Sequence, residues 1–100
     1  MVGTASSLRA LVDERREQIR SVVARHKGIS VALFGSVARR EERADSDLDF
    51  LVEFGEGASL FDLARLEMDL EELLGRDVDV VSVGGLLPED EDIRQDAVLL

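Results

Sequence analysis

The chain has 100 residues, of which 45% are hydrophobic and 34% charged, and its formal net charge is −10. This length predicts one domain spanning residues 1–100, and the lack of cysteine excludes disulfides and thiolate metal sites and favours a reducing, cytoplasmic location. No apolar stretch is long enough to span a membrane, and the acidic excess argues against direct nucleic acid binding, because Lys and Arg neutralise nucleic acid phosphates. The carboxylates would instead suit divalent cations or a basic protein, or would serve only solubility.

The first predicted elements are a long helix and a buried strand. Apolar residues recur at helical spacing over residues 8–27, where Ser7 is suited to cap the start of the helix and Gly28 to stop it. The apolar segment 29–34 (ISVALF) is bounded by glycines, which is typical of a buried strand. Residues 35–40 are then expected to turn directly into a short helix.

A second strand is predicted over residues 48–54, because polar and apolar residues alternate there. One face would carry Leu48, Phe50, Val52 and Phe54, and the other Asp47, Asp49, Leu51 and Glu53. A second long helix follows, from a cap at Ser59 to a stop near Gly75. The apolar face would anchor the strand in the core and leave its acids on the opposite side.

The second long helix (residues 59–74) carries two apolar stripes. The first is formed by Leu63, Leu66, Leu70, Leu73 and Leu74, and the second by Phe61, Ala64 and Met68. We expect both stripes to pack inside the domain, one on the sheet and one on the first helix. The alternative for the second stripe is a surface that binds a partner.

The C-terminal part predicts a third strand over residues 77–83 and a short last helix that starts at Pro88. Helices and strands therefore alternate along the chain. This order predicts an α/β (α+β) fold, in which helices flank a small mixed sheet of three or four strands.

The first candidate for chemistry is Gly35-Ser36, at the junction of a strand and a helix. Glycine lets a phosphate approach the backbone closely, and the free N–H groups at the start of a helix attract anions. The Ser36 hydroxyl can add a hydrogen bond. Gly-Ser turns are common, so this motif gains weight only beside other signals.

The second candidate is a set of three acids. Asp47 and Asp49 share one face of a strand, where they repel each other unless a cation lies between them. Asp79 is charged inside an apolar strand and can join them if the two strands are neighbours. Carboxylates on adjacent strands can hold two Mg²⁺ ions, which phosphoryl-transfer enzymes keep about 3.5–4 Å apart. With the Gly-Ser turn, the acids predict nucleotidyl or phosphoryl transfer; a solvated acidic strand edge is the alternative.

The motifs together resemble those of a known family. The segment GSVARREERADSDLDFLVEF and the later Asp79 resemble the minimal nucleotidyltransferase branch of the polymerase-beta-like superfamily, over residues 29–83. The resemblance implies that Asp79 helps to deprotonate the acceptor hydroxyl. It also implies that Gly35 and Ser36 bind the triphosphate of ATP. The two Mg²⁺ ions would be bound by Asp47, Asp49 and Asp79.

The resemblance also implies that Arg39 anchors a phosphate or the loop after the short helix. Members of the branch often have GSRARG here, whereas this chain has Val37 in place of the common arginine and Arg40 in place of the common glycine. The basic side chains could contact the phosphates or form salt bridges at a solvated helix end. The residues concerned are Arg39, Arg40 and Arg43, with the acids Glu41, Glu42 and Asp45.

The branch is commonly the antitoxin of a toxin–antitoxin pair. The resemblance implies a partner, a HEPN-type ribonuclease toxin, and transfer of AMP from ATP to a tyrosine of that toxin, within a hetero-oligomer of the two proteins. Two alternatives remain: an antitoxin that neutralises its toxin only by covering it, and an enzyme that modifies a small molecule. Three converging acids favour the enzyme, and the absence of a second domain disfavours a small-molecule acceptor.

Overall fold

A computed structural model of the chain describes residues 7–41, 43, 46–85 and 88–100. Its centre is a four-stranded mixed sheet in the order β3-β2-β1-β4. The strands are β1 (Gly28–Phe34), β2 (Leu48–Phe54), β3 (Val78–Ser82) and β4 (Val98–Leu99). The helices are α1 (Leu8–Glu14), α2 (Arg16–Arg25), α3 (Gly35–Ala38), α4 (Leu60–Leu74) and α5 (Glu91–Asp96), with 3₁₀ turns at Val83–Gly85 and Pro88–Asp90.

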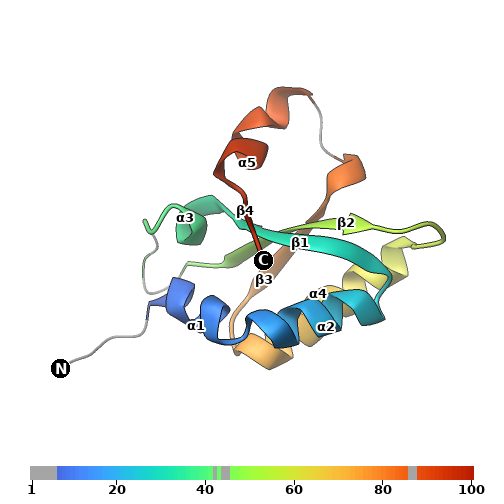
Figure 1. Cartoon of the computed structure of the whole chain (residues 1–100), viewed down its shortest axis with the longest axis horizontal. Helices are drawn as coiled ribbons and strands as arrows, with labels where there is room; N and C mark the ends of the chain where they lie inside the picture. Colours follow the sequence, from blue (N-terminus) through green and yellow to red (C-terminus); the bar gives the residue numbers. More distant parts are fainter. Residues whose placement is uncertain (1–6, 42, 44–45, 86–87) are drawn as a thin grey trace.

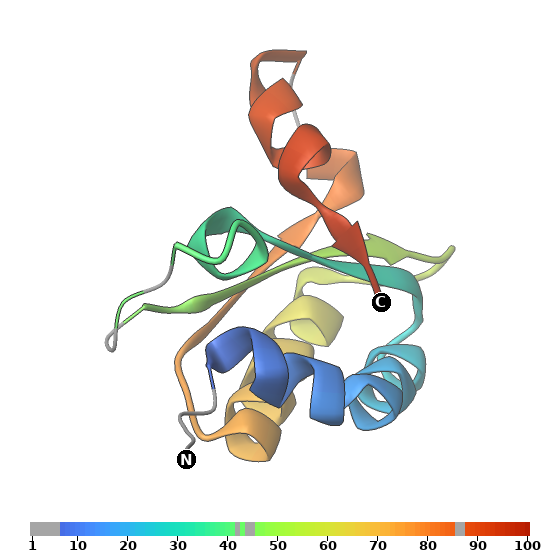
Figure 2. The same cartoon turned by 60° about the vertical axis from the view of Figure 1, so that its left-hand side comes forward.

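The helices divide between the two faces of the sheet. Helices α1, α2 and α4 cover one face, whereas the C-terminal turns and α5 rise from the other (Figures 1 and 2). Helix α3 lies at the end of β1, beside the start of β2 (Figure 1). The mixed α/β fold with three or four strands is thereby confirmed.

The long first helix predicted over residues 8–27 is wrong in one respect, because it is broken into α1 and α2 at Arg15. A straight helix would place Arg15 in the buried stripe, and burying an unpaired guanidinium is costly. The break leaves Arg15 exposed, where it bonds Gln18 at 3.2 Å. The stop also differs, since Lys27 takes the left-handed conformation (φ 67°) and Gly28 already begins β1.

Strand β2 is the centre of the fold, and its predicted alternation is confirmed. It runs antiparallel to β1 and parallel to β3. Leu48, Phe50 and Val52 are fully buried on the helical side, where they meet residues of α2 and α4. Asp49 consequently belongs to the opposite face of the sheet, away from the main core.

Helix α4 begins and ends as predicted, but only one of its stripes is buried. Ser59 and Asp62 form a capping box, and Gly75 closes the helix in the left-handed conformation. Leu66, Leu70 and Leu74 belong to the core, whereas Phe61 and Met68 are 75% and 66% exposed and Ala64 is exposed as well. The expectation that both stripes pack inside the domain is therefore wrong.

The reason lies in how α2 meets α4. Helix α2 approaches the side of α4 that carries Asp69, and the ring of His26 at the end of α2 bonds Asp69 at 2.7 Å. That side is about 100° around the helix from Met68. Helix α2 therefore contacts α4 without covering its second stripe.

The acids between the stripes close one edge of the sheet. The carboxylate of Glu67 accepts a hydrogen bond from the Val80 N–H at 3.0 Å, and that of Glu71 accepts one from the Val78 N–H at 3.2 Å. Unpaired N–H groups on an edge strand invite pairing with other chains. Helix α4 thus both packs on the sheet and satisfies the backbone of β3.

Strand β4 was not predicted. It pairs with β1 through Ala32 and Leu33, and the Leu100 N–H extends this pairing to the Val31 carbonyl at 2.9 Å. Two residues are too few to show the alternation from which strands are recognised. Through this pairing, the segment after α5 lies next to β1, the strand that precedes α3.

The capping box of α4 gives a pH-dependent prediction. Hydrogen bonding from the Ser59 backbone holds the pKa of the Asp62 carboxyl below its usual range, so Asp62 stabilises the fold above its unfolded-state pKa. That contribution is lost as the pH falls through the folded-state pKa. Asp62→Asn should therefore lower the melting temperature at neutral pH and have little effect in acid. Glu72→Gln, an exposed change on the same helix, should show no such trend; parallel trends for both variants would contradict the prediction.

Candidate functional site

The turn between β1 and α3 can accept only glycine at its first position. Gly35 has φ 78°, which L side chains rarely adopt. A Cβ atom placed on Gly35 would also collide with Oδ2 of Asp49 and lie 3.2 Å from its Cγ. The Asp49 carboxylate therefore rests directly against the Gly-Ser turn, where Ser36 is half-buried and begins α3.

The acids lie on, or next to, the two adjacent strands β2 and β3. Asp49 on β2 stands opposite Asp79 on β3 in the parallel register, and neighbouring strands are about 4.8 Å apart. Asp47 lies just before β2 and is exposed, as is Asp79, whereas Asp49 is half-buried. Strands β2 and β3 are therefore adjacent, which is the condition under which Asp79 can join Asp47 and Asp49.

The electrostatics show that Asp49 lies in an unfavourable environment. Burial, followed by repulsion from Asp79 and Asp47, raises the pKa of Asp49 from 3.8 to about 6, and the positive charge of Arg39 partly opposes this rise. None of the hydrogen bonds or ion pairs among the described residues involves the carboxylate of any of these acids. A half-buried carboxylate without a partner, facing like charges, is a site that a cation would stabilise.

The acids have not converged to a closed cage. Within the described part of the chain, no group of three carboxylate, imidazole or thiolate side chains is arranged to hold a metal ion. The donor set nevertheless fits Mg²⁺, which prefers carboxylate oxygens and commonly retains water and substrate phosphates as further ligands. Such an ion does not need a cage made of protein side chains alone.

Arg39 lies beside these acids and is held by two others. Its Nε donates to Glu41 at 3.0 Å and its Nη1 to Asp96 at 2.8 Å, and these bonds, that with Glu41 foremost, raise the pKa of the guanidinium. The salt-bridge interpretation is thus confirmed for Arg39 with Glu41, while Glu42 and Asp45 lie outside the described residues. The Asp96 bond was missed, because 57 positions separate the partners.

The structure shows what the two departures from the branch's usual motif, Val37 and Arg40, entail. Val37 is fully buried in the core, so its side chain is not available to contact phosphate. Arg40 has φ 60°, a conformation that favours glycine. Arg40 and Arg43 are both exposed, and neither forms an ion pair with another described residue.

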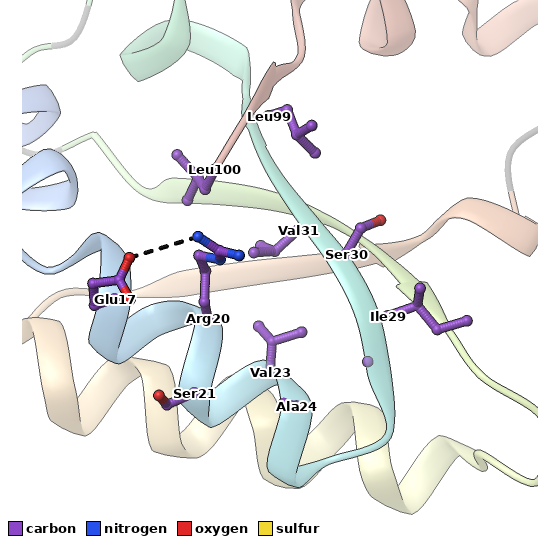
Figure 3. Close-up of a pocket in the computed structure, with 11 residues that line it drawn as sticks. Glu17, Arg20, Ser21, Val23, Ala24, Ile29, Ser30, Val31, Leu99 and Leu100 are labelled. Carbon is purple, nitrogen blue, oxygen red and sulfur yellow. Dashed lines mark ion pairs between the residues drawn. The ribbon is translucent and has the colours of Figure 1, made fainter.

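A cavity of about 460 Å³ lies elsewhere, between α2 and the edge formed by β1 and β4 (Figure 3). Val31 and Leu100 line it beside the exposed side chains of Ile29 and Leu99. The predicted site residues do not line this cavity. The Gly-Ser turn and the acids therefore lie outside this cavity, with Asp49 on the face of the sheet opposite the helical core.

A strand that ends in a Gly-Ser turn, next to acids on two adjacent strands, defines the class of nucleotidyltransferases. The nucleotidyltransferase domain family matches residues 15–98. The chain therefore belongs to the nucleotidyltransferase family, within its minimal branch. Among the described residues, no helix is long and apolar enough to cross a membrane.

Curated relatives agree with this assignment. A Methanocaldococcus jannaschii protein, provisionally named a protein adenylyltransferase, is 44% identical over 77 residues, which are 77% of this chain and 83% of the relative. Protein adenylyltransferase MntA of Thermococcus cleftensis is 41% identical over 78 residues, covering 70% of this chain and 79% of the relative.

Solved structures show the same fold. A structure provisionally described as a minimal nucleotidyltransferase matches with a TM-score of 0.84 and 49% identity, covering 98% of this chain and all of that one. The MNT antitoxin in a complex with a tri-AMPylated Shewanella oneidensis HEPN toxin matches with a TM-score of 0.67 and 18% identity, covering 87% and 69% of the two chains. The latter likeness extends to the fold alone.

Proposed function

We propose that this nucleotidyltransferase is a Mg²⁺-dependent protein adenylyltransferase, which acts as an antitoxin by transferring AMP from ATP to a tyrosine of a HEPN-type toxin. The observation that carries the proposal is the contact between Asp49 and Gly35, with Asp79 next to Asp49 on the adjoining strand. This contact supports the proposal because the Gly-Ser turn, where a triphosphate would bind, is next to the acids that would hold its cations.

The residues of the site have three roles: binding the triphosphate, holding the cations and accepting the proton. The backbone of Gly35 and the hydroxyl of Ser36 bind the triphosphate, and Arg39 adds positive charge beside it. Asp47, Asp49 and Asp79 hold two Mg²⁺ ions, which when bound stabilise the attacking and leaving oxygens. Asp79, an exposed acid on the neighbouring strand, accepts the proton of the tyrosine hydroxyl.

The reaction conserves its atoms without an added reagent. The tyrosine oxygen forms a bond with the α-phosphorus of ATP, while the bond from that phosphorus to the bridging oxygen of the β-phosphate breaks. Pyrophosphate leaves, and the tyrosine proton passes to Asp79. The protein supplies positioning and charge, which is where catalysis of such transfers originates.

The proposed partner is supported by two similar proteins. One relative is named a protein adenylyltransferase, and the fold also occurs in an antitoxin complexed with an AMPylated HEPN toxin. The exposure of Asp47 and Asp79 supports a protein acceptor, because an acceptor that brings its own docking surface does not require a deep pocket.

The proposal is tested with a purified HEPN-type protein of the native host. This chain, ATP and Mg²⁺ are incubated with it, and its peptides are analysed by mass spectrometry. We expect AMP on a tyrosine with the wild type and none with Asp79→Asn. A stable complex that blocks ribonuclease activity without any AMP would instead establish the steric antitoxin. Absence of both complex and AMP would contradict the proposed partner and favour a small-molecule acceptor.

A further inference from the structure

The Arg39 side chain is held in place by bonds rather than by packing. It is 43% exposed, yet its Nε and Nη1 atoms donate to carboxylates from two different segments, Glu41 and Asp96. Two such bonds fix the plane of a guanidinium, whose geometry is rigid. The direction in which the remaining N–H groups point is therefore set by these acids.

Of the two acids, Asp96 has the firmer attachment to the fold. It is the last residue of α5 and lies two positions before Val98, which pairs with Leu33 of β1. Strand β1 continues directly into α3, so Asp96 and the Gly-Ser turn are anchored on the same strand. Glu41, in contrast, belongs to the loop that follows α3.

The bonds to the two acids leave donors available. A guanidinium has five N–H groups, and within the described residues the Nη2 atom of Arg39 forms no hydrogen bond. The backbone N–H of Arg39 donates to the Gly35 carbonyl oxygen at 3.1 Å, so Arg39 lies one helical turn from the glycine that Asp49 contacts. Donors so placed are suited to a phosphate oxygen.

We infer that Asp96 is a positioning residue for nucleotide binding, which holds Arg39 so that its remaining N–H groups face the phosphates bound at Gly35-Ser36. The inference rests on the proposed binding of a nucleoside triphosphate at that turn. Asp96 itself does not contact the nucleotide. The inference gives a function to the C-terminal segment, which lies outside the sequence motif.

The direction in which ATP affinity changes when Asp96 is replaced distinguishes a positioning role from a simple effect of its charge. Removing the negative charge of Asp96 would by itself strengthen the binding of an anion such as ATP. Loss of a positioning bond would weaken it, by about 5-fold for one hydrogen bond. The two explanations therefore predict changes in opposite directions.

The test measures the dissociation constant of ATP by calorimetry in the presence of Mg²⁺. We expect Asp96→Ala to bind ATP about 5-fold more weakly than the wild type, with a nearly unchanged melting temperature because exposed ion pairs stabilise little. Glu91→Ala, which removes the same charge from the same helix, should bind like the wild type. In an Arg39→Ala background, Asp96→Ala should cause no further weakening.

Each outcome is decisive. Equal or tighter ATP binding by Asp96→Ala would overturn the inference and leave the proposed function intact. Equal weakening in the Arg39→Ala background would also overturn it, because Asp96 would then act independently of Arg39. A wild type that fails to bind ATP would refute the proposed function, and the inference with it.

Discussion

Replacing Asp49 with asparagine is expected to abolish nucleotidyl transfer while making the ligand-free protein more stable. Asp49 is the acid in contact with the Gly-Ser turn, so transfer should fall by at least about 100-fold when its charge is lost. The same charge is costly without a cation, since burial and the neighbouring acids raise the pKa of Asp49 to about 6.

The expected gain in stability follows from this pKa. A carboxyl whose pKa is higher in the folded than in the unfolded state destabilises the fold at pH 7, and the penalty disappears as the pH falls below the unfolded value. After allowance for solvent screening, Asp49→Asn should add about 1–2 kcal/mol, or several degrees in melting temperature. The measurement is thermal unfolding in EDTA, beside transfer assays in Mg²⁺.

The control for this variant is Glu53→Gln, on the same strand and the same face but away from the acids. It should change neither transfer nor melting temperature appreciably. A destabilised Asp49→Asn protein would show that the acid has a structural role, and normal turnover would exclude its role in binding cations.

The second large effect is expected for Gly35→Ala. The left-handed conformation costs an alanine about 1–2 kcal/mol, and the added Cβ would also collide with Asp49, which adds about 1–3 kcal/mol. Relief of the collision would move either α3 or the Asp49 carboxylate. ATP binding should therefore be lost together with stability, as measured by denaturant unfolding and calorimetry.

Gly57→Ala separates the two causes. Gly57 has φ 84°, but no atom lies within 4 Å of the position of its added Cβ. Its variant should show the conformational cost alone. Adding Asp49→Ala to Gly35→Ala should recover part of the lost stability, because the colliding carboxylate is gone. A Gly35→Ala protein no less stable than Gly57→Ala would contradict the close contact.

The parts of the fold that the sequence predicted well are those with strong local signals. Strand β2 was predicted with its bounds because its residues alternate in polarity except at Leu51, which is apolar and buried. The ends of helix α4 were predicted from Ser59, which caps its start, and Gly75, which ends it. Both caps involve only groups nearby in the sequence. Strand β4, in contrast, is recognisable only from its pairing with β1, which is a tertiary interaction.

The candidate site shows the same division. The spacing of Asp47 and Asp49 determines their common face, but their approach to Asp79 depended on which strands pair, and the structure supplies this. Nothing in the local sequence connects Arg39 with Asp96, so the C-terminal contribution emerged only from the fold. The exposed stripe of Phe61 and Met68 was misassigned for a similar reason, since the place where α2 meets α4 is not encoded in either helix alone.

The central claim, that this chain transfers nucleotides, is tested most directly with ATP labelled at the α-phosphate. The protein is incubated with Mg²⁺ and a lysate of the native host, beside the Asp47→Asn/Asp49→Asn variant and a parallel reaction with γ-labelled ATP. We expect a labelled protein band with the α-label and the wild type only. A band obtained with the γ-label, or an equal α-labelled band with the double variant, would contradict it.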